Sequence, residues 1–491
     1  MASKRRSERK RATPPHTAVI NGPPEPHRGV FCNRTLNLRQ IAAIGYDMDY
    51  TLIHYNVDQW ERRAYHHIHQ KLCDQGWSLD NLEFDSTSVM RGLIIDTELG
   101  NLVKANRFGY IKLARHGTHS IDFNMQRKLY GRTIVDLSES RWVFLNTLFS
   151  LSAACLYSQL VNLLDSNKLP KVLSYADLYG LLRDSLDATH MEGILKAEIV
   201  ADPDRFVEVE AEVPLTLLDQ KKAGKRLLLI TNSEWPYTQA MMQYAFDPFL
   251  PGEMTWRDLF DVIIVSARKP DFLSAKNPFF QVVDETGLLK PVIGGPKPGG
   301  IFLGGNAAAV EEYLGVSGDR ILYVGDHIFS DVHVSKDLLR WRTALVVREL
   351  EDEITATQAF SQRRDKLRRL MTEKEKLELA QSQAQLLLQR KRDKYGPAPG
   401  GSVNELERSI AQGRNRLKAL DDEITPLARA DRQVSNNRWG PLMRAGNDKS
   451  HMASQIERHA DIYMSRVSNF MQYTPFAYFR SPRGSLPHDP Q

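Results

Sequence analysis

The stretch IGYDMDYTL, residues 44–52, decides the fold that the rest of the sequence implies. Apolar residues at 41–44 lead into it, as expected for a buried strand of a parallel sheet. The carboxylates of Asp47 and Asp49 follow where that strand ends, and Thr51 comes two positions later. Two carboxylates at such a place are costly unless a cation lies between them, and Mg²⁺ prefers oxygen ligands. The stretch predicts a metal-assisted site, although a solvated turn is the simpler explanation of these residues taken alone.

Three further apolar strands end in polar residues that suit the same chemistry. Strands are predicted at 225–230, 261–265 and 320–324, with a fifth at 343–347. Helices alternate with them, which predicts a parallel sheet whose ligands lie beyond the carboxyl ends of its strands. A helix N-cap, a surface lysine and a Gly-Asp turn explain the polar residues one by one. Their conjunction predicts a single site formed by Asp47 and Asp49 with Thr231, Asn232, Ser233, Lys269, Asp326 and Asp331.

The order of these motifs resembles that of the haloacid dehalogenase superfamily, whose signature D-x-D-x-T stands at 47–51. The strings Thr-Asn-Ser at 231–233, Ala-Arg-Lys-Pro at 267–270 and Gly-Asp-His-Ile-Phe-x-Asp at 325–331 are similar to those of the cytosolic purine 5′-nucleotidases specific for IMP and GMP. The similarity extends from about Phe31 to Arg480. It implies a Rossmann-like α/β core and a phosphohydrolase activity.

The resemblance also implies roles for the strand-end residues. Asp47 would be the nucleophile that forms an aspartyl-phosphate, and Asp49 the acid for the leaving alcohol and later the base for water. The main-chain oxygen of Asp49 and the carboxylates of Asp47 and Asp326 would hold Mg²⁺. Lys269 would neutralise negative charge on the nucleophile and on the transferring phosphoryl group. Asp331 would support either Lys269 or the water shell of the metal. Phosphoryl oxygens would be bound by Thr231, Asn232 and Ser233.

Residues 55–204 are too long for a loop between strand and helix, so they are predicted to form a cap inserted after the first strand. In its predicted helix at 175–200, Arg183, Asp187 and His190 fall on one face, which by itself indicates an ordinary surface pair. The resemblance implies that Arg183 and Asp187 read the 6-oxo edge of a purine. It further implies that Lys196 binds substrate, that Phe149 packs on the base, and that His190 belongs to the same site.

The remaining chain divides by composition. Residues 1–28 are basic and proline-rich and are predicted to be a disordered tail, and 481–491 a second tail. The core is assigned to 29–54 and 205–352, with the cap between them containing hairpins in 85–120 and a helix over 141–167. Apolar 3-4 repeats predict an antiparallel coiled-coil arm at 353–426, followed by a helical segment at 427–480 that packs on the core. The glycine-rich segment 294–305 is predicted to be a flexible loop before a helix.

Bulk properties fit an ordinary soluble globular protein: 491 residues, 42% hydrophobic, 25% charged and a net charge of +5. The basic residues crowded into 4–11 favour a solubilising arm over a nucleic-acid arm. We expect no membrane span, because no run of about 18 uncharged apolar residues occurs. Cysteines occur only at the widely separated positions Cys32, Cys73 and Cys155, which fits a reducing cytoplasm. Separately, we expect a homo-oligomer, either a dimer or a tetramer.

The sequence thus predicts a Mg²⁺-dependent 5′-nucleotidase acting on purine nucleoside 5′-monophosphates. A related phosphatase, or a nucleoside phosphotransferase for another small phosphate ester, is the alternative within the same chemistry. A non-catalytic assembly or nucleic-acid-binding protein, using the arm and the basic tail, is the alternative from another class. Such a protein has no need of both Asp47 and Asp49.

Overall fold

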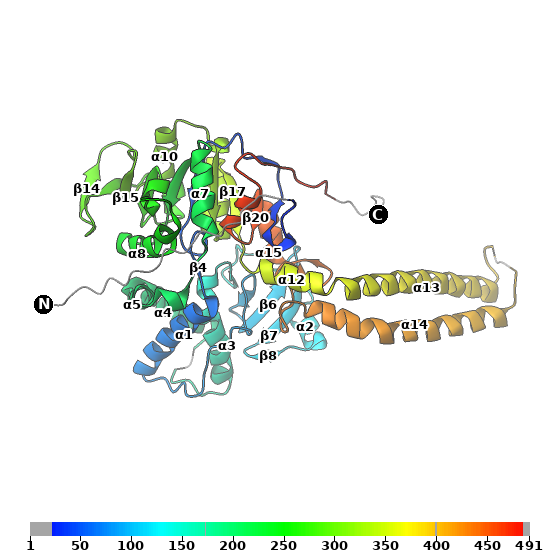
Figure 1. Cartoon of the computed structure of the whole chain (residues 1–491). Helices are drawn as coiled ribbons and strands as arrows, with labels where there is room; N and C mark the ends of the chain where they lie inside the picture. Colours follow the sequence, from blue (N-terminus) through cyan, green and yellow to red (C-terminus); the bar gives the residue numbers. More distant parts are fainter. Residues whose placement is uncertain (1–21, 172, 398–399, 485–491) are drawn as a thin grey trace. The chain divides into compact units, whose positions relative to one another are not determined.

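The computed structural model describes residues 22–171, 173–397 and 400–484 (Figure 1). The predicted tails fall largely outside these ranges, since 1–21 and 485–491 are not described. The chain forms two compact units, one made of Met1–Glu351 with Leu442–Gln491 and the other of Asp352–Pro441. The first carries the central sheet and the cap.

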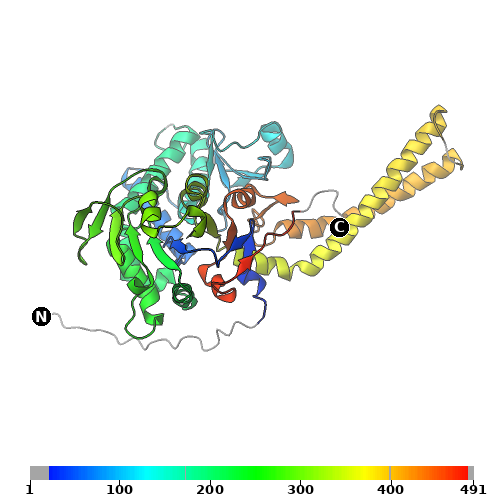
Figure 2. The ribbon, with the colours of Figure 1, turned by 90° about the horizontal axis from the view of Figure 1, so that it is seen from above.

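A ten-stranded sheet, in the order β1-β20-β17-β16-β3-β11-β12-β15-β13-β14, forms the centre of the larger unit (Figures 1 and 2). Neighbours from β20 to β15 run parallel, whereas β1, β13 and β14 pair antiparallel. This is the mostly parallel α/β sheet that the sequence predicted. Its strands are β1 (Val30–Cys32), β3 (Ala43–Tyr46), β11 (Arg226–Ile230), β12 (Val262–Val265), β13 (Phe279–Val282), β14 (Leu289–Val292), β15 (Gly300–Gly304), β16 (Ile321–Gly325), β17 (Arg342–Val346) and β20 (Ile462–Met464).

The middle strands are buried along almost their whole length, because helices pack on the sheet. One apolar cluster joins side chains of β11, β12 and β16 to those of short helices on the same face. These helices are α9 (Asp271–Ser274), α10 (Ala307–Leu314) and α11 (Val334–Leu339). The other helices of this core are α6 (Pro203–Phe206), α7 (Glu212–Lys222), α8 (Trp235–Phe246) and α15 (His451–His459).

The prediction of a flexible glycine-rich loop at 294–305 is wrong for its second half, since Gly300–Gly304 is strand β15. It pairs parallel with β12 and antiparallel with β13, and neither β13 nor β14 was predicted. The apolar residues between the flanking glycines explain the strand, because Phe302 is buried in the core cluster. The helix expected after this segment is present and begins at Ala307, with the Asn306 side chain accepting a hydrogen bond from the Ala309 amide.

The cap contains a five-stranded antiparallel sheet, in the order β8-β7-β6-β5-β9, and the predicted hairpins are present in it. The predicted helix over 141–167 is wrong at its start, because Trp142–Phe144 forms β9 and the helix begins at Leu151. Aromatic and β-branched residues favour a strand at that point. Gly193, with a left-handed φ of 71°, divides the helix predicted at 175–200 into two. The cap elements are β4 (His54–Tyr55), α1 (Val57–Asp74), β5 (Ile94–Asp96), β6 (Asn101–Ala105), β7 (Ile111–His116), β8 (His119–Ser120), α2 (Phe123–Tyr130), β9, α3 (Leu151–Asp165), α4 (Tyr175–Glu192), α5 (Ile194–Ala201) and β10 (Val207–Glu208).

The segment predicted to be helical at 427–480 also supplies a strand of the central sheet. Ile462–Met464 forms β20, which pairs parallel with β17 and antiparallel with β1 near the start of the chain. Alternating apolar residues in a run of three are too short a signal to separate a strand from a helix. Three short strands complete this region: β18 (Arg444–Ala445), β19 (Asp448–Lys449) and β21 (Tyr478–Phe479). The last pairs antiparallel with β2 (Leu36–Asn37), near the start of the chain.

One stretch of the described residues, Leu148–Asp165, is long and apolar enough to cross a membrane by length and composition. Most of it, 61%, is buried inside the protein, as in the core helices of many globular proteins. It is therefore weak evidence for a membrane span.

The smaller unit is built on two long antiparallel helices, α13 (Ser361–Asp393) and α14 (Val403–Arg432). Ion pairs join the start of α13 to the end of α14, as between Arg364 and Asp431, and the end of α13 to the start of α14, as between Arg392 and Glu407. Ile410, Leu420 and Ile424 are buried on α14. The helix α14 continues past 426, where the arm was predicted to end. The helix α12 (Leu350–Ala359) precedes the pair in the chain.

Candidate active site

Four neighbouring strands, in the order β16-β3-β11-β12, bring the predicted residues to one edge of the sheet. Asp47, Thr231 and Asp326 each directly follow one of these strands, and Lys269 follows β12 after a short turn. The Asp47 amide donates to the Val324 carbonyl at 2.9 Å, and the Thr231 amide donates to the Ile264 carbonyl at 2.9 Å. The parallel pairing therefore continues to the first residue of the site, which fixes where these side chains begin.

The ammonium of Lys269 lies at the centre of this edge, and its side chain is only 2% exposed. Its Nζ is 2.9 Å from Asp47 Oδ1 and 2.7 Å from Asp331 Oδ1, and it donates to the Tyr323 hydroxyl at 2.9 Å. The Tyr323 hydroxyl in turn donates to the Ile230 carbonyl at 3.0 Å. Two carboxylates and a phenol thus hold the ammonium in one position before any substrate binds.

Asp47, Asp326 and Asp331 form a group of buried carboxylates whose nearest oxygens all lie within 4.8 Å of one another. Burial raises the pKa of Asp47 to about 7, an effect that Lys269 opposes and that the neighbouring carboxylates Asp331 and Asp49 increase. Burial and the same kind of repulsion, from Asp331 and Asp47, raise the pKa of Asp326 well above its ordinary value. Lys269 and, for Asp326, Arg91 lower these pKa values, but they do not offset the burial of three neighbouring carboxylates.

A divalent cation fits this group. The Oδ2 atom of Asp326 is buried and has no hydrogen-bond partner in the described part of the chain. Its main-chain oxygen accepts a hydrogen bond from Arg91 Nη1 at 3.2 Å, so the backbone is fixed while the carboxylate remains available. Oxygen donors at such spacing are the ligands that Mg²⁺ takes in proteins.

The carboxylate of Asp49 lies apart from this group and faces side chains of the cap and of the loop after β11. It accepts hydrogen bonds from the Tyr55 hydroxyl at 2.5 Å and the Ser233 hydroxyl at 2.6 Å. The Tyr237 hydroxyl donates to that of Tyr55 at 3.0 Å. A turn after Asp47, in which Met48 O accepts from the amides of residues 52 and 53, directs the two carboxylates to different places. Both oxygens of the Asp49 carboxylate are thereby held by hydroxyl donors.

The predicted phosphate-binding triplet is engaged with protein groups in this structure. Asn232 accepts a hydrogen bond from the Lys269 amide at 2.7 Å and donates to the Lys269 carbonyl at 3.2 Å. Thr231 Oγ1 accepts from the Ser233 amide at 3.0 Å. The two Asn232 bonds fix the backbone of the lysine, a role that the sequence did not predict.

Two of the predicted cap residues approach the core site or its turn. Lys196 Nζ lies 3.5 Å from the Ser233 hydroxyl and 5.0 Å from the centre of the Tyr237 ring. The Phe149 ring lies 4.7 Å, between centroids, from the ring of Tyr50 in the turn after Asp49. Lys196 therefore lies beside the hydroxyl that binds Asp49, and Phe149 packs on the residue that follows Asp49.

The other cap residues lie differently. Arg183 and Asp187 are exposed on α4, and Arg183 pairs at 3.1 Å with Asp184 rather than with Asp187. No hydrogen bond or ion pair joins either residue to the strand-end residues within the described chain. The side chain of His190 lies outside the described residues.

Sequence reasoning missed several groups that support the site. Tyr323 and Tyr55 bind Lys269 and Asp49, and Arg91 binds both Asp326 and the carboxylate of Glu349, with Nε at 2.9 Å from Oε1. A signal for Tyr323 exists, because it is the one hydroxyl-bearing residue in the buried run ILYVG. Tyr55 comes from a cap segment without a local motif, whereas Arg91 belongs to the string Arg-Gly-Leu at 91–93, which resembles the purine nucleotidases but gave the arginine no role.

Comparison with known proteins shows which family the chain belongs to. A model of the 5′ nucleotidase family matches residues 30–491. The chain belongs to the 5′ nucleotidase family. It is thus an enzyme of the phosphoric monoester hydrolase class, in agreement with the haloacid dehalogenase-type motifs described above.

Individual relatives are more distant. A 5′-nucleotidase domain-containing protein of Dictyostelium discoideum is 26% identical over 475 residues, which covers 94% of this chain and 74% of that protein. The structure of CbbY from Rhodobacter sphaeroides in complex with phosphate shares 15% identity over 62% of this chain and 86% of its own, with a TM-score of 0.24. An archaeal β-phosphoglucomutase from a hyperthermophilic Pyrococcus shares 10% identity over the same fractions, with a TM-score of 0.27. At these TM-scores the two structures add nothing to the assignment.

Proposed function

We propose that this enzyme hydrolyses purine nucleoside 5′-monophosphates of the IMP and GMP type, with Mg²⁺, through an aspartyl-phosphate on Asp47. The observation that supports it most directly is the position of Lys269 Nζ, between Asp47 at 2.9 Å and Asp331 at 2.7 Å, in the same group as Asp326, whose Oδ2 has no hydrogen-bond partner among the described residues. A phosphoryl group in transfer needs positive charge and accurate positioning more than any other assistance.

Two steps follow from the arrangement of the two carboxylates. In the first, a carboxylate oxygen of Asp47 bonds to phosphorus while the bond from phosphorus to the ester oxygen breaks, and the carboxyl of Asp49 gives its proton to that oxygen. In the second, Asp49 takes a proton from a water whose oxygen attacks phosphorus, and the Asp47 carboxylate is released. The hydroxyls of Tyr55 and Ser233 hold Asp49 in position for both transfers.

The cation would be held by the carboxylates of Asp47 and Asp326 and the main-chain oxygen of Asp49, with Asp331 shared between Lys269 and the water shell. Bound there, Mg²⁺ supplies positive charge for the phosphoryl oxygens. Lys269 supplies a second positive charge next to Asp47. Lys196, next to Ser233, adds a third that reaches the phosphate from the cap.

The cap supports the assignment of a purine substrate. Phe149 borders the turn at Tyr50, where a base can pack on its ring. Arg183 and Asp187 would read the 6-oxo purine edge, the arginine donating to the carbonyl and the carboxylate accepting from the ring N–H. Because both are exposed and Arg183 contacts Asp184, a phosphatase of broader specificity is the second candidate.

A substrate panel separates these candidates. We expect release of phosphate from IMP and GMP to exceed that from AMP and CMP, to require Mg²⁺ and to stop in a chelator. Equal rates for IMP and AMP would remove Arg183 and Asp187 from the site while leaving the core chemistry intact. Transfer of phosphate to an added nucleoside, detected as a new monophosphate, would identify a phosphotransferase. A homo-oligomer in the cytoplasm stays a prediction, which light scattering and cell fractionation would test.

A further inference from the structure

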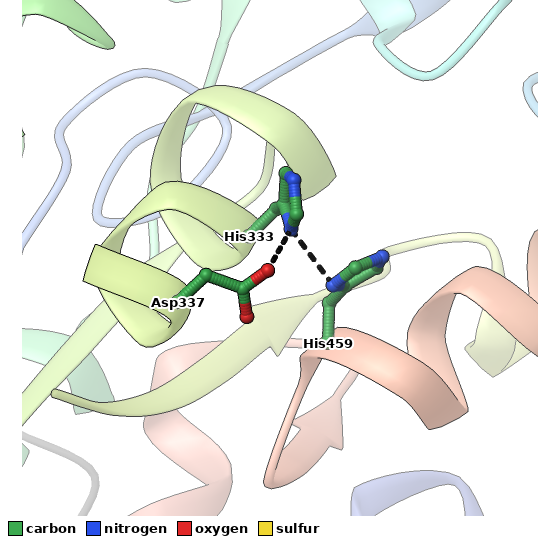
Figure 3. Close-up of side chains that lie close together, drawn as sticks. All are labelled: His333, Asp337 and His459. Carbon is green, nitrogen blue, oxygen red and sulfur yellow. Dashed lines mark hydrogen bonds and ion pairs between the residues drawn. The ribbon is translucent and has the colours of Figure 1, made fainter. Parts of the chain in front are cut away.

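A second group of metal-ligating side chains lies outside the site described above (Figure 3). His333 Nδ1 is 3.0 Å from His459 Nδ1 and 3.1 Å from Asp337 Oδ2. His333 and Asp337 stand one helical turn apart at the junction of the π-helical turn Ile328–His333 with α11, and His459 ends α15. Three donor atoms from two distant parts of the chain therefore converge on one point.

Hydrogen bonding alone leaves this group unsatisfied. An imidazole Nδ1 carries either one proton or one lone pair, and only one proton fits between two nitrogens 3.0 Å apart. If His333 Nδ1 donates to Asp337, its proton is not available to His459, and if it accepts from His459, its lone pair faces the carboxylate. A cation at the centre would accept the lone pairs of all three groups at once.

The spacing of the donors suits a transition metal. A tetrahedral ion with bonds of about 2.0–2.1 Å to nitrogen has ligand atoms about 3.3 Å apart. The observed 3.0 and 3.1 Å are close to that value. Imidazole donors favour ions such as Zn²⁺, whereas Mg²⁺ prefers the all-oxygen set near Lys269.

The surrounding contacts hold the ligands in place without a metal. The Thr343 hydroxyl donates to the main-chain oxygen of His459 at 2.9 Å. Lys336 on α11 pairs with Asp461 at 2.8 Å, which ties the same two segments together beside the ligands. His459 is buried, whereas the Asp337 side chain is 54% exposed, so an ion can enter from the Asp337 side.

We propose that His333, Asp337 and His459 form a second metal site, which binds a divalent transition ion such as Zn²⁺ with three protein ligands and leaves further positions to water. The site would join α15 to the segment that carries Asp331, two residues before His333. Its expected effect is to fasten the C-terminal part of the larger unit to the loop behind the catalytic carboxylates.

The test uses the full chain, freed of metal with a chelator and then returned to buffer containing excess Mg²⁺, so that the oxygen-ligand site is supplied. Titration with Zn²⁺ is followed by calorimetry, and titration with Co²⁺ by the visible absorption that a tetrahedral ion gives. The variants are His333→Ala, Asp337→Asn and His459→Ala, and His119→Ala, an exposed histidine on β8, is the matched control.

We expect the unmodified chain and His119→Ala to bind one more Zn²⁺ than His333→Ala and His459→Ala, and to give the tetrahedral Co²⁺ spectrum. Asp337→Asn should bind Zn²⁺ more weakly than the unmodified chain, because a neutral amide replaces an anionic ligand. Zn²⁺ should raise the melting temperature of the unmodified chain but not that of His333→Ala. Equal Zn²⁺ binding by the chain and its His333→Ala variant, or no Zn²⁺ binding by either, would overturn the proposal. Because His459 is buried, the result for His459→Ala counts only if circular dichroism shows that the variant is folded. If it is not folded, Zn²⁺ binding by the exposed variant Asp337→Asn is the deciding measurement.

Discussion

Lys269 and Arg183 are both cations next to carboxylates, but their surroundings differ. The Lys269 side chain is 2% exposed and contacts two buried aspartates, whereas the Arg183 side chain is 60% exposed and contacts Asp184, which is 71% exposed. Charges attract far more strongly in a protein interior than in water, and a surface pair contributes only about 0–1 kcal/mol. The pairing of a cation with a carboxylate is therefore much stronger at the strand ends than on α4.

The two regions therefore suit different parts of the proposed function. At the strand ends, burial makes every charge depend on its partner, so the geometry exists before substrate arrives. On α4 the charges are solvated, so they are free to exchange partners with the proposed purine base. Changes at the strand ends should therefore alter both chemistry and stability, and changes on α4 should alter selectivity alone.

The largest effect is expected for Asp47→Asn, which removes the proposed nucleophile and keeps the shape of the side chain. Turnover of IMP should fall by about 10⁴-fold or more, as for other nucleophile replacements. The protein should remain folded and should not melt earlier in the absence of Mg²⁺, because the amide that replaces the carboxylate carries no charge to bury. Phosphate release and thermal melting measure the two parts. Retention of a tenth of the activity would show that Asp47 is not the nucleophile.

The next effect compares the two cations directly. Lys269→Met leaves Asp47 and Asp331 buried without their ammonium, so we expect a loss of about 3–5 kcal/mol in the free energy of unfolding. We expect turnover to fall by about 10²–10³-fold as well. Arg183→Met, the matched exposed change, should stay within about 0.5 kcal/mol of the unmodified chain. Urea unfolding of both variants measures this difference. Equal losses in the free energy of unfolding would show that burial does not distinguish the two cations.

These two regions also differ in how far the sequence predicted them. The strand-end residues were predictable because apolar runs mark buried strands, and the parallel-sheet rule then places whatever follows them at one edge. The residues Asp47, Thr231, Lys269 and Asp326 needed no further information to be grouped. Short strands between glycines, such as Gly300–Gly304, were missed because a run of three apolar residues has no distinct period.

Supporting contacts could not be predicted in the same way. Tyr323 binds Lys269 because β16 lies next to β3 and its tyrosine faces the ammonium, which depends on strand order and register rather than on spacing in the chain. Arg91 reaches Asp326 from the cap across 235 positions of sequence. The pairing of Arg183 with Asp184 rather than Asp187 depends on side-chain torsions that no helical spacing determines.

A third effect concerns pH and metal. Burial raises the pKa of Asp47 to about 7, above its value in the unfolded chain, so the folded protein without metal binds a proton that the unfolded chain has lost. The stability contributed by this proton is present near pH 4 and is lost as the pH rises to about 7. Between pH 5.5 and 7.5 we expect the metal-free protein to lose about 2 kcal/mol from this group.

Melting curves at both pH values, with and without Mg²⁺, measure this effect. Because the cation needs ionised carboxylates, Mg²⁺ should raise the melting temperature more at pH 7.5 than at pH 5.5 and should release protons when it binds. Asp47→Asn is the control, and the pH dependence of its metal-free form should be smaller. An unchanged pH dependence in that variant would assign the proton to another group.

The smallest effect is expected on α4, where two neighbouring aspartates allow a matched test. If Asp187 accepts the ring N–H of a 6-oxo purine, Asp187→Asn should lower the preference for IMP over AMP in kcat/KM by about tenfold, the value of one hydrogen bond to a charged group. Asp184→Asn removes the present partner of Arg183 and should leave that preference unchanged or raise it, since Arg183 is then free to meet the base. Neither variant should shift the melting temperature, because both carboxylates are exposed. A loss of selectivity in Asp184→Asn, or of stability in Asp187→Asn, would mean that the charges on this face of the helix depend on one another, as those at the strand ends do. Catalysis and substrate recognition would then not be separated between the two regions.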